Sequence, residues 1–141
     1  MTSATAETRT GHALEGPVAA AVALGAATVY TYARSPFEAG AFPVCLFYAG
    51  TGLYCPGCGG LRAVHTLLHG DALGALQLNA LAILFVIPIT IVAVTWWAGN
   101  AAGKSWPAPR LPAVVWWGLA TLVLLFTIAR NIPYFAPYLA P

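Results

Sequence analysis

The chain has 141 residues, of which six are Lys or Arg and four are Asp or Glu, so its net charge is +2. Hydrophobic residues make up 60% of it and charged residues only 7%, whereas a soluble domain carries about 25% charged residues. This composition excludes a water-soluble domain and a disordered chain, and the small net charge excludes a nucleic-acid partner, so the lipid bilayer is the expected partner.

Three uncharged apolar runs are long enough to cross a bilayer as helices, and they cover residues 16–33, 78–98 and 113–129. Around them lie a flexible N-terminal segment at 1–15, a Trp/Pro-rich loop at 99–112 and a tail at 130–141. Pro88 is expected to kink the second span. We therefore predict an all-α fold, an integral membrane helical bundle in which residues 1–141 form a single domain with about three transmembrane helices.

The segment between the first two spans, residues 34–77, contains all three cysteines of the chain. Two of them, Cys55 and Cys58, form a Cys-x-x-Cys turn. From residue 60 to residue 69 an amphipathic pattern predicts a short helix, which lies at the interface or re-enters between the spans. Gly70 is expected to end this helix and Asp71 to cap the next one.

The three cysteines have the residue types and spacing of a metal site. Cys45, Cys55 and Cys58 can supply three of the four ligands that Zn²⁺ prefers, with His65 or His69 as the fourth. The two histidines are four residues apart and share one face of the predicted helix. A Cys₃His zinc site is therefore one hypothesis, and zinc is the only cofactor expected.

Other chemistries fit the same three cysteines. A Cys-x-x-Cys pair at a helix N-terminus has a lowered thiol pKa, which suits thiol–disulfide exchange. A structural disulfide and inert packing as small buried hydrophobes are also open. Disulfides are favoured if the loop lies outside the cytoplasm, and a metal is favoured if it lies inside.

Three charged residues lie nearest to membrane depth, and we expect structural roles for them. Arg62 can extend its guanidinium group to the interface, Asp71 can cap a helix, and Arg130 can end the third span at the interface.

A set of residues around the cysteines forms a pattern of its own. Its members are Cys45, Gly52, Cys55, Pro56, Gly57, Cys58, Gly59, Arg62, His69, Gly70, Asp71 and Asn79, with Arg130 and Asn131 near the end of the chain. This pattern resembles the bacterial domain-of-unknown-function family 2752 of small membrane proteins. That family usually has Thr before the arginine, where this chain has Leu61. The resemblance implies a multi-pass protein of the bacterial inner (cytoplasmic) membrane and no assigned activity.

The sequence contains no Ser-His-Asp, Walker or His-Glu-x-x-His pattern, so we expect no hydrolytic or phosphoryl-transfer enzyme. We predict a small accessory or binding protein whose loop holds a metal-binding or redox-active site. The alternatives are a membrane thiol–disulfide oxidoreductase and a structural subunit whose loop docks a membrane partner. Gly16 and Gly25 permit close helix packing, and hence a homo-oligomer or a membrane protein partner.

Overall fold

The computed structural model describes residues 3–38, 40–107 and 110–139, and their regular structure is entirely helical. The elements are α1 (Ser3–Ala33), α2 (Leu46–Thr51), α3 (Gly60–Leu68), α4 (Ala72–Leu81), the π-helical segment η1 (Ala82–Val86), α5 (Ile87–Ala101), α6 (Ala113–Asn131) and α7 (Ala136–Leu139). The predicted all-α class is therefore confirmed.

In the part of the chain that the structure describes, three helical stretches are long and apolar enough to cross a membrane. They are Leu14–Ala33, Ala72–Ala101 and Ala113–Asn131, which confirms the predicted three-span, multi-pass architecture. The helix α1 begins at Ser3 and so includes most of the N-terminal segment 1–15, whose flexibility stays a prediction, while residues 1–2 lie outside the described part of the chain. Ala and Glu are strong helix formers, and they continue the helix into this more polar segment.

The second span is interrupted at Asn79 rather than at Pro88. Asn79 has non-helical backbone angles, φ −162° and ψ 88°, and the π-helical segment η1 follows shortly after it. Proline cannot donate a backbone hydrogen bond and crowds the carbonyl four residues before it. The wider π-helical turn directly before α5 accommodates both the missing hydrogen bond and the crowded carbonyl. Pro88 therefore lies in the first turn of α5 without breaking the helix.

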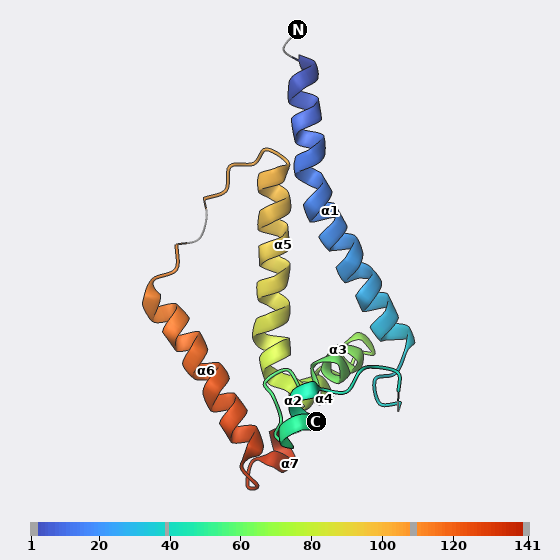
Figure 1. The fold of residues 1–141 in the computed structure, drawn as a ribbon, viewed down its shortest axis with the longest axis vertical. Coiled ribbons are helices and arrows are strands. Elements are labelled where there is room, and N and C mark those ends of the chain that lie inside the picture. Colours follow the sequence, from blue (N-terminus) through green and yellow to red (C-terminus); the bar gives the residue numbers. More distant parts are fainter. Residues whose placement is uncertain (1–2, 39, 108–109, 140–141) are drawn as a thin grey trace.

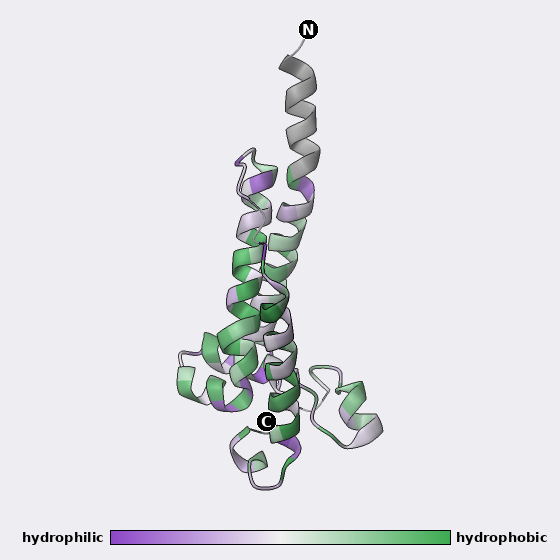
Figure 2. Ribbon diagram, turned by 90° about the vertical axis from the view of Figure 1, so that its left-hand side faces the viewer, coloured by the Kyte–Doolittle hydropathy of each residue, from purple (hydrophilic) through white to green (hydrophobic). Residues whose placement is uncertain are grey.

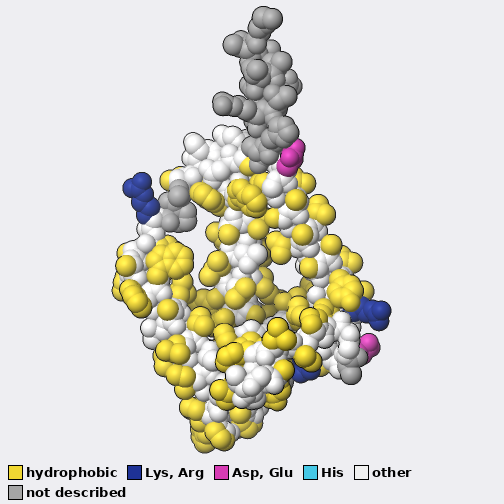
Figure 3. All heavy atoms as spheres, in the orientation of Figure 1, with side chains coloured by type: hydrophobic (Ala, Val, Ile, Leu, Met, Phe, Trp, Pro, Cys, Tyr) yellow, Lys and Arg dark blue, Asp and Glu magenta, His cyan; other side chains and the backbone are white. Residues whose placement is uncertain are grey.

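The long helices diverge from one end of the molecule, where the short helices gather. Figure 1 shows α1, α5 and α6 extending in one direction, with α2, α3, α4 and α7 clustered at their common end. The first helix packs on α5 near Gly16, where an added Cβ would lie 2.8 Å from a ring carbon of Trp97. In the space-filling view, one opening lies between α5 and α1 and another lies between α5 and α6 (Figure 3).

The surface of the long helices is apolar, as contact with lipid requires. Hydrophobic colours dominate the middle of these helices, and hydrophilic residues gather toward their ends (Figure 2). Large side chains such as Val22, Val92 and Trp117 are 66%, 66% and 74% exposed. The largest fully buried side chains among the described residues are instead polar, namely Arg130 and Asn79. Both lie at the end of the molecule where the short helices gather.

Candidate metal centre

The structure brings the three cysteines together. Cys45 directly precedes α2, and the other two cysteines lie in the turn before α3. The Cys55 sulfur lies 3.5 Å from that of Cys45 and 3.1 Å from that of Cys58, and all three sulfurs lie within 4.8 Å of one another. A disulfide requires about 2.05 Å, so the three are free thiols that converge on one point.

The Cys-x-x-Cys turn is closed by its own backbone. The N–H of Cys58 donates to the carbonyl of Cys55 at 3.1 Å, and the N–H of Gly60 donates to the carbonyl of Gly57 at 2.9 Å. Gly59 then adopts a left-handed conformation with φ +77°, from which α3 begins. Only glycine adopts this conformation without steric cost, because it lacks a Cβ.

We expect Gly59→Ala to lower the free energy of unfolding by about 1–2 kcal/mol, the cost of placing a Cβ at positive φ. The measurement is the thermal unfolding midpoint of the purified protein in detergent. The matched control is Gly50→Ala, because Gly50 lies within α2 and its added Cβ would meet nothing within 4 Å. A Gly59→Ala protein as stable as the control would contradict the requirement for a left-handed residue.

A buried arginine from the last span holds the carbonyls of this turn. Arg130 is 0% exposed. Its two terminal nitrogens donate to the carbonyls of Cys55, Pro56 and Cys58 at 3.4, 3.4 and 2.8 Å, and to that of Leu78 at 3.4 Å. The guanidinium also lies over the Phe126 ring, 5.0 Å from its centroid. Arg130 lies in the last turn of the third span, as expected, and it also makes a buried contact between α6 and the cysteine turn, which the sequence did not predict.

Asn79 also holds the turn, through its side-chain amide. Its nitrogen donates to the carbonyls of Pro56 and Cys58 at 2.9 and 3.1 Å, and its oxygen accepts from the Ala82 N–H at 2.9 Å. Asn79 therefore bridges its own break in the second span and fixes the turn at the same time.

Asn131 binds the backbone just before the turn. Its oxygen accepts from the N–H of Tyr54 at 2.8 Å, and its nitrogen donates to the carbonyl of Tyr54 at 2.9 Å and to that of Thr127 at 2.8 Å. Side chains from the second and third spans thus fix the cysteine-bearing segment on two sides.

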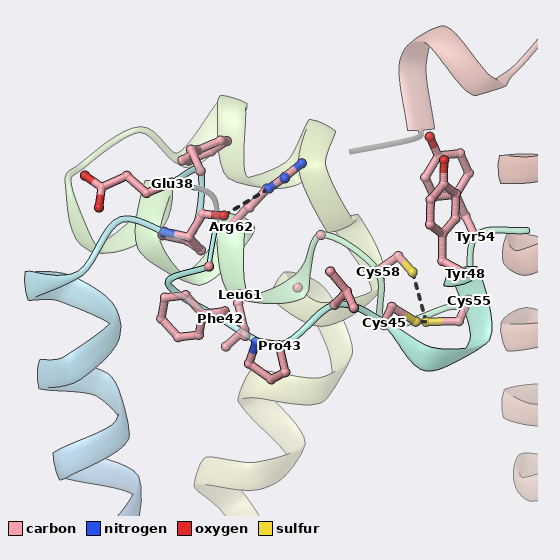
Figure 4. A pocket seen from close by; sticks show the side chains of 17 residues that line it. Glu38, Phe42, Pro43, Cys45, Tyr48, Tyr54, Cys55, Cys58, Leu61 and Arg62 are labelled. Carbon is pink, nitrogen blue, oxygen red and sulfur yellow. Dashed lines mark hydrogen bonds between the residues drawn. The ribbon is translucent and has the colours of Figure 1, made fainter. Parts of the chain in front are cut away.

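The cysteine cluster opens into a cavity of about 760 Å³. Figure 4 shows Cys45, Cys55 and Cys58 at one end of this cavity, beside Tyr48 and Tyr54. The two tyrosine rings stack at 4.9 Å, and the hydrogen bond that the Tyr54 hydroxyl makes with Tyr48 favours its neutral form and raises the pKa of Tyr54. A small molecule or water can therefore reach the thiols from the cavity.

The opposite end of the cavity carries charge. Glu38 and Arg62 lie there (Figure 4). The Arg62 Nε donates to the carbonyl of Pro36 at 3.4 Å, and its guanidinium carbon lies 5.3 Å from the centroid of the Phe37 ring. Arg62 thus contacts the 34–45 loop, where it lines the cavity.

Two of the thiols differ in acidity because their surroundings differ. The backbone N–H of Tyr48 donates to the Cys45 sulfur, and together with contacts from the other two thiols it lowers the pKa of Cys45 to about 7. Burial disfavours the charged form of Cys58 and raises its pKa to about 12. In the metal-free protein Cys45 is therefore the better nucleophile at neutral pH.

The histidines of α3 are not part of the cysteine cluster. The Nδ1 atom of His65 lies 2.7 Å from the Thr31 carbonyl, and that of His69 lies 2.8 Å from the His65 carbonyl. The His69 ring stacks on Tyr32 at 4.6 Å, so the shared face of the two histidines packs toward α1. Among the described residues, the group of close ligand atoms consists of the three cysteines.

The remaining motif residues shape the ends of the short helices. Gly52 and Gly70 adopt left-handed conformations, with φ +71° and +90°, after α2 and α3. The Asp71 carboxylate accepts from the Gly74 N–H at 2.8 Å, which confirms the predicted cap of α4. These residues fix the path of the loop around the thiols and do not contribute ligands.

Residues 45–94 match a family model described as protein of unknown function (DUF2752). The chain resembles this family. The matched segment contains the three cysteines and Asn79, and it ends before α6, which carries Arg130 and Asn131. No curated protein matches the chain, and no solved structure matches it. The family description assigns no activity, so the function is argued from the site.

Proposed function

We propose that this protein is a membrane-embedded metal-binding protein, an accessory or binding protein of the bacterial cytoplasmic membrane. Cys45, Cys55 and Cys58 bind Zn²⁺ or a similar thiophilic divalent cation as thiolates. The observation that carries the proposal is the convergence of three free thiols within 4.8 Å of one another.

The sulfur positions support tetrahedral coordination. With Zn–S bonds of about 2.3 Å, two sulfurs on one tetrahedral zinc lie about 3.8 Å apart. The separations of 3.1 and 3.5 Å require only a small outward adjustment of the side chains. The turn around the thiols is held by Arg130 and Asn79, so most of the ordering that binding requires is already present in the fold.

A fourth ligand could come from the cavity that the three thiols line. His65 and His69 are the sequence-based candidates for the fourth coordination position, but in the structure their Nδ1 atoms contact backbone carbonyls within α1 and within α3. Because the thiols line an open cavity, water or a small ligand can occupy this position instead. Open fourth positions are typical of zinc sites that bind or transform a ligand rather than only stabilise a fold.

The test is the metal content of untagged protein purified in detergent under reducing conditions. We expect about one zinc per chain, lost in Cys55→Ser and Cys58→Ser. His69→Ala is the matched control and is expected to retain the metal, because the His69 ring stacks on Tyr32. Wild-type protein without bound metal after reconstitution with zinc would overturn the proposal.

A second candidate, a thiol–disulfide oxidoreductase, is favoured by the position of Cys55 between the other two thiols and by the lowered pKa of Cys45. In this reaction two thiols form one disulfide and pass two electrons and two protons to a membrane quinone. A thiol count that falls from three to one on addition of a quinone, with no change in Cys55→Ser, would support it. Three thiols unchanged by the quinone would exclude it.

A further inference from the structure

Within the described part of the chain, the charge of Arg130 has no anionic partner among its direct contacts. All four hydrogen bonds of its terminal nitrogens go to backbone carbonyls, which carry no formal charge. Its Nε atom is buried without any hydrogen-bond partner. Backbone carbonyls offset part of the cost of burying this cation, and an opposite charge close to it would offset more.

The described acidic side chains near this end of the molecule do not supply that charge. Asp71 caps α4 through the Gly74 N–H. Glu38 lies at the opposite end of the cavity from the cysteines (Figure 4). The groups near Arg130 that can become anionic are Cys55, Cys58 and Tyr54. The pKa of Tyr54 is raised above its usual value, which leaves the thiols of the two cysteines whose carbonyls the guanidinium binds.

We infer that Arg130 is the counter-ion of the metal-loaded cysteine cluster and that it selects a cluster with one net negative charge. This inference rests on the proposed metal-binding function. Three thiolates contribute three negative charges and a divalent cation contributes two positive ones, which leaves one negative charge. Arg130 balances it, and the buried site becomes neutral as a whole. A fully protonated, metal-free cluster leaves the arginine charge unbalanced.

The same argument explains why a residue from the last span contacts the turn. Neutral side chains can order a turn, as Asn79 and Asn131 already do. A guanidinium placed against the backbone of two ligand residues adds an electrostatic contribution that an amide cannot provide. Arg130 is therefore a positioning residue that also sets the charge preference of the site.

The decisive comparison is Arg130→Lys against Arg130→Gln, because both side chains can donate to the carbonyls and only lysine keeps the charge. Affinity for Co²⁺ is measured by chelator competition, followed by the sulfur-to-cobalt charge-transfer absorption. We expect Arg130→Gln to weaken binding by roughly 10- to 100-fold, the usual effect of losing a group that supports metal ligands. Arg130→Lys should retain most of the affinity. Asn131→Ala is the neutral control, since it removes contacts to Tyr54 without changing charge.

The outcomes separate this inference from the proposed function. Wild-type protein that binds no cobalt refutes metal binding itself. If the wild type binds cobalt and the two Arg130 variants lose affinity equally, or if Arg130→Gln loses no affinity, only the counter-ion role is refuted. If Arg130→Gln does not fold, proton release decides. At pH 6, calorimetry of wild-type protein in buffers of different ionisation enthalpy should show close to three protons released per Zn²⁺. Release of two would mean a neutral cluster, which would overturn the inference and the binding of all three cysteines as thiolates, but not metal binding itself.

Discussion

A maleimide added to the reduced, metal-free protein at pH 7 is expected to modify Cys45 well before Cys58. The pKa of Cys45 is about 7 and that of Cys58 about 12. About half of the Cys45 thiol is therefore ionised at this pH, and almost none of the Cys58 thiol is. A low-pKa thiolate is intrinsically less nucleophilic, which offsets part of this difference. The net rate ratio should be roughly two orders of magnitude.

The rate at which maleimide labels Cys45 should depend on pH, because only the ionised thiol reacts. Because the Cys45 pKa is lowered to about 7, its labelling rate should fall about tenfold per pH unit below 7 and rise at most about twofold above it. The measurement is time-resolved peptide mass spectrometry. Cys45→Ser should remove the fast phase and leave the slow one. Equal rates at the two sites, or faster labelling of Cys58, would contradict the acidity difference.

The three spans could be predicted from the sequence because hydropathy is a local property. An uncharged run such as 78–98 needs a bilayer whatever it packs against. Local sequence patterns also predict the short helix after the cysteine turn and the capping role of Asp71. The hydrogen bond from the Gly74 N–H to the Asp71 carboxylate confirms the cap. The break at Asn79 was not predicted, because it depends on contacts with Pro56 and Cys58, which lie more than twenty residues earlier in the chain.

The candidate site was predictable only in part, for a related reason. Cysteine spacing indicated the thiol cluster, but helical spacing shows only that two side chains share a face and not which element that face meets. His65 and His69 do share a face, and it meets Thr31 and Tyr32 of α1 rather than the thiols. Arg130 was expected at the interface because nothing local to the end of a span indicates a contact with residues more than seventy positions earlier.

Replacing Asn79 with leucine is expected to lower the free energy of unfolding by about 3 kcal/mol, since each buried group left without its partner costs about 1–3 kcal/mol. Asn79 is 1% exposed. The substitution removes its bonds to the carbonyls of Pro56 and Cys58 and to the N–H of Ala82. Arg130 still contacts both carbonyls and limits the loss, whereas the Ala82 N–H loses its side-chain partner. The measurement is the thermal unfolding midpoint in a fixed detergent.

The matched control is Asn100→Leu, at the other end of the same span. Asn100 also makes two side-chain hydrogen bonds, one donated to the Trp96 carbonyl and one accepted from the Trp106 N–H, but it is only partly buried. Water can replace its bonds, so its loss should cost about 1 kcal/mol or less.

The two variants should also differ in the reactivity of their thiols. Loosening of the turn should make Cys58 react faster with maleimide in Asn79→Leu, while Asn100→Leu should label as the wild type does. Equal destabilisation by both substitutions, with unchanged thiol reactivity, would mean that Asn79 stabilises its helix alone and does not hold the cysteine turn.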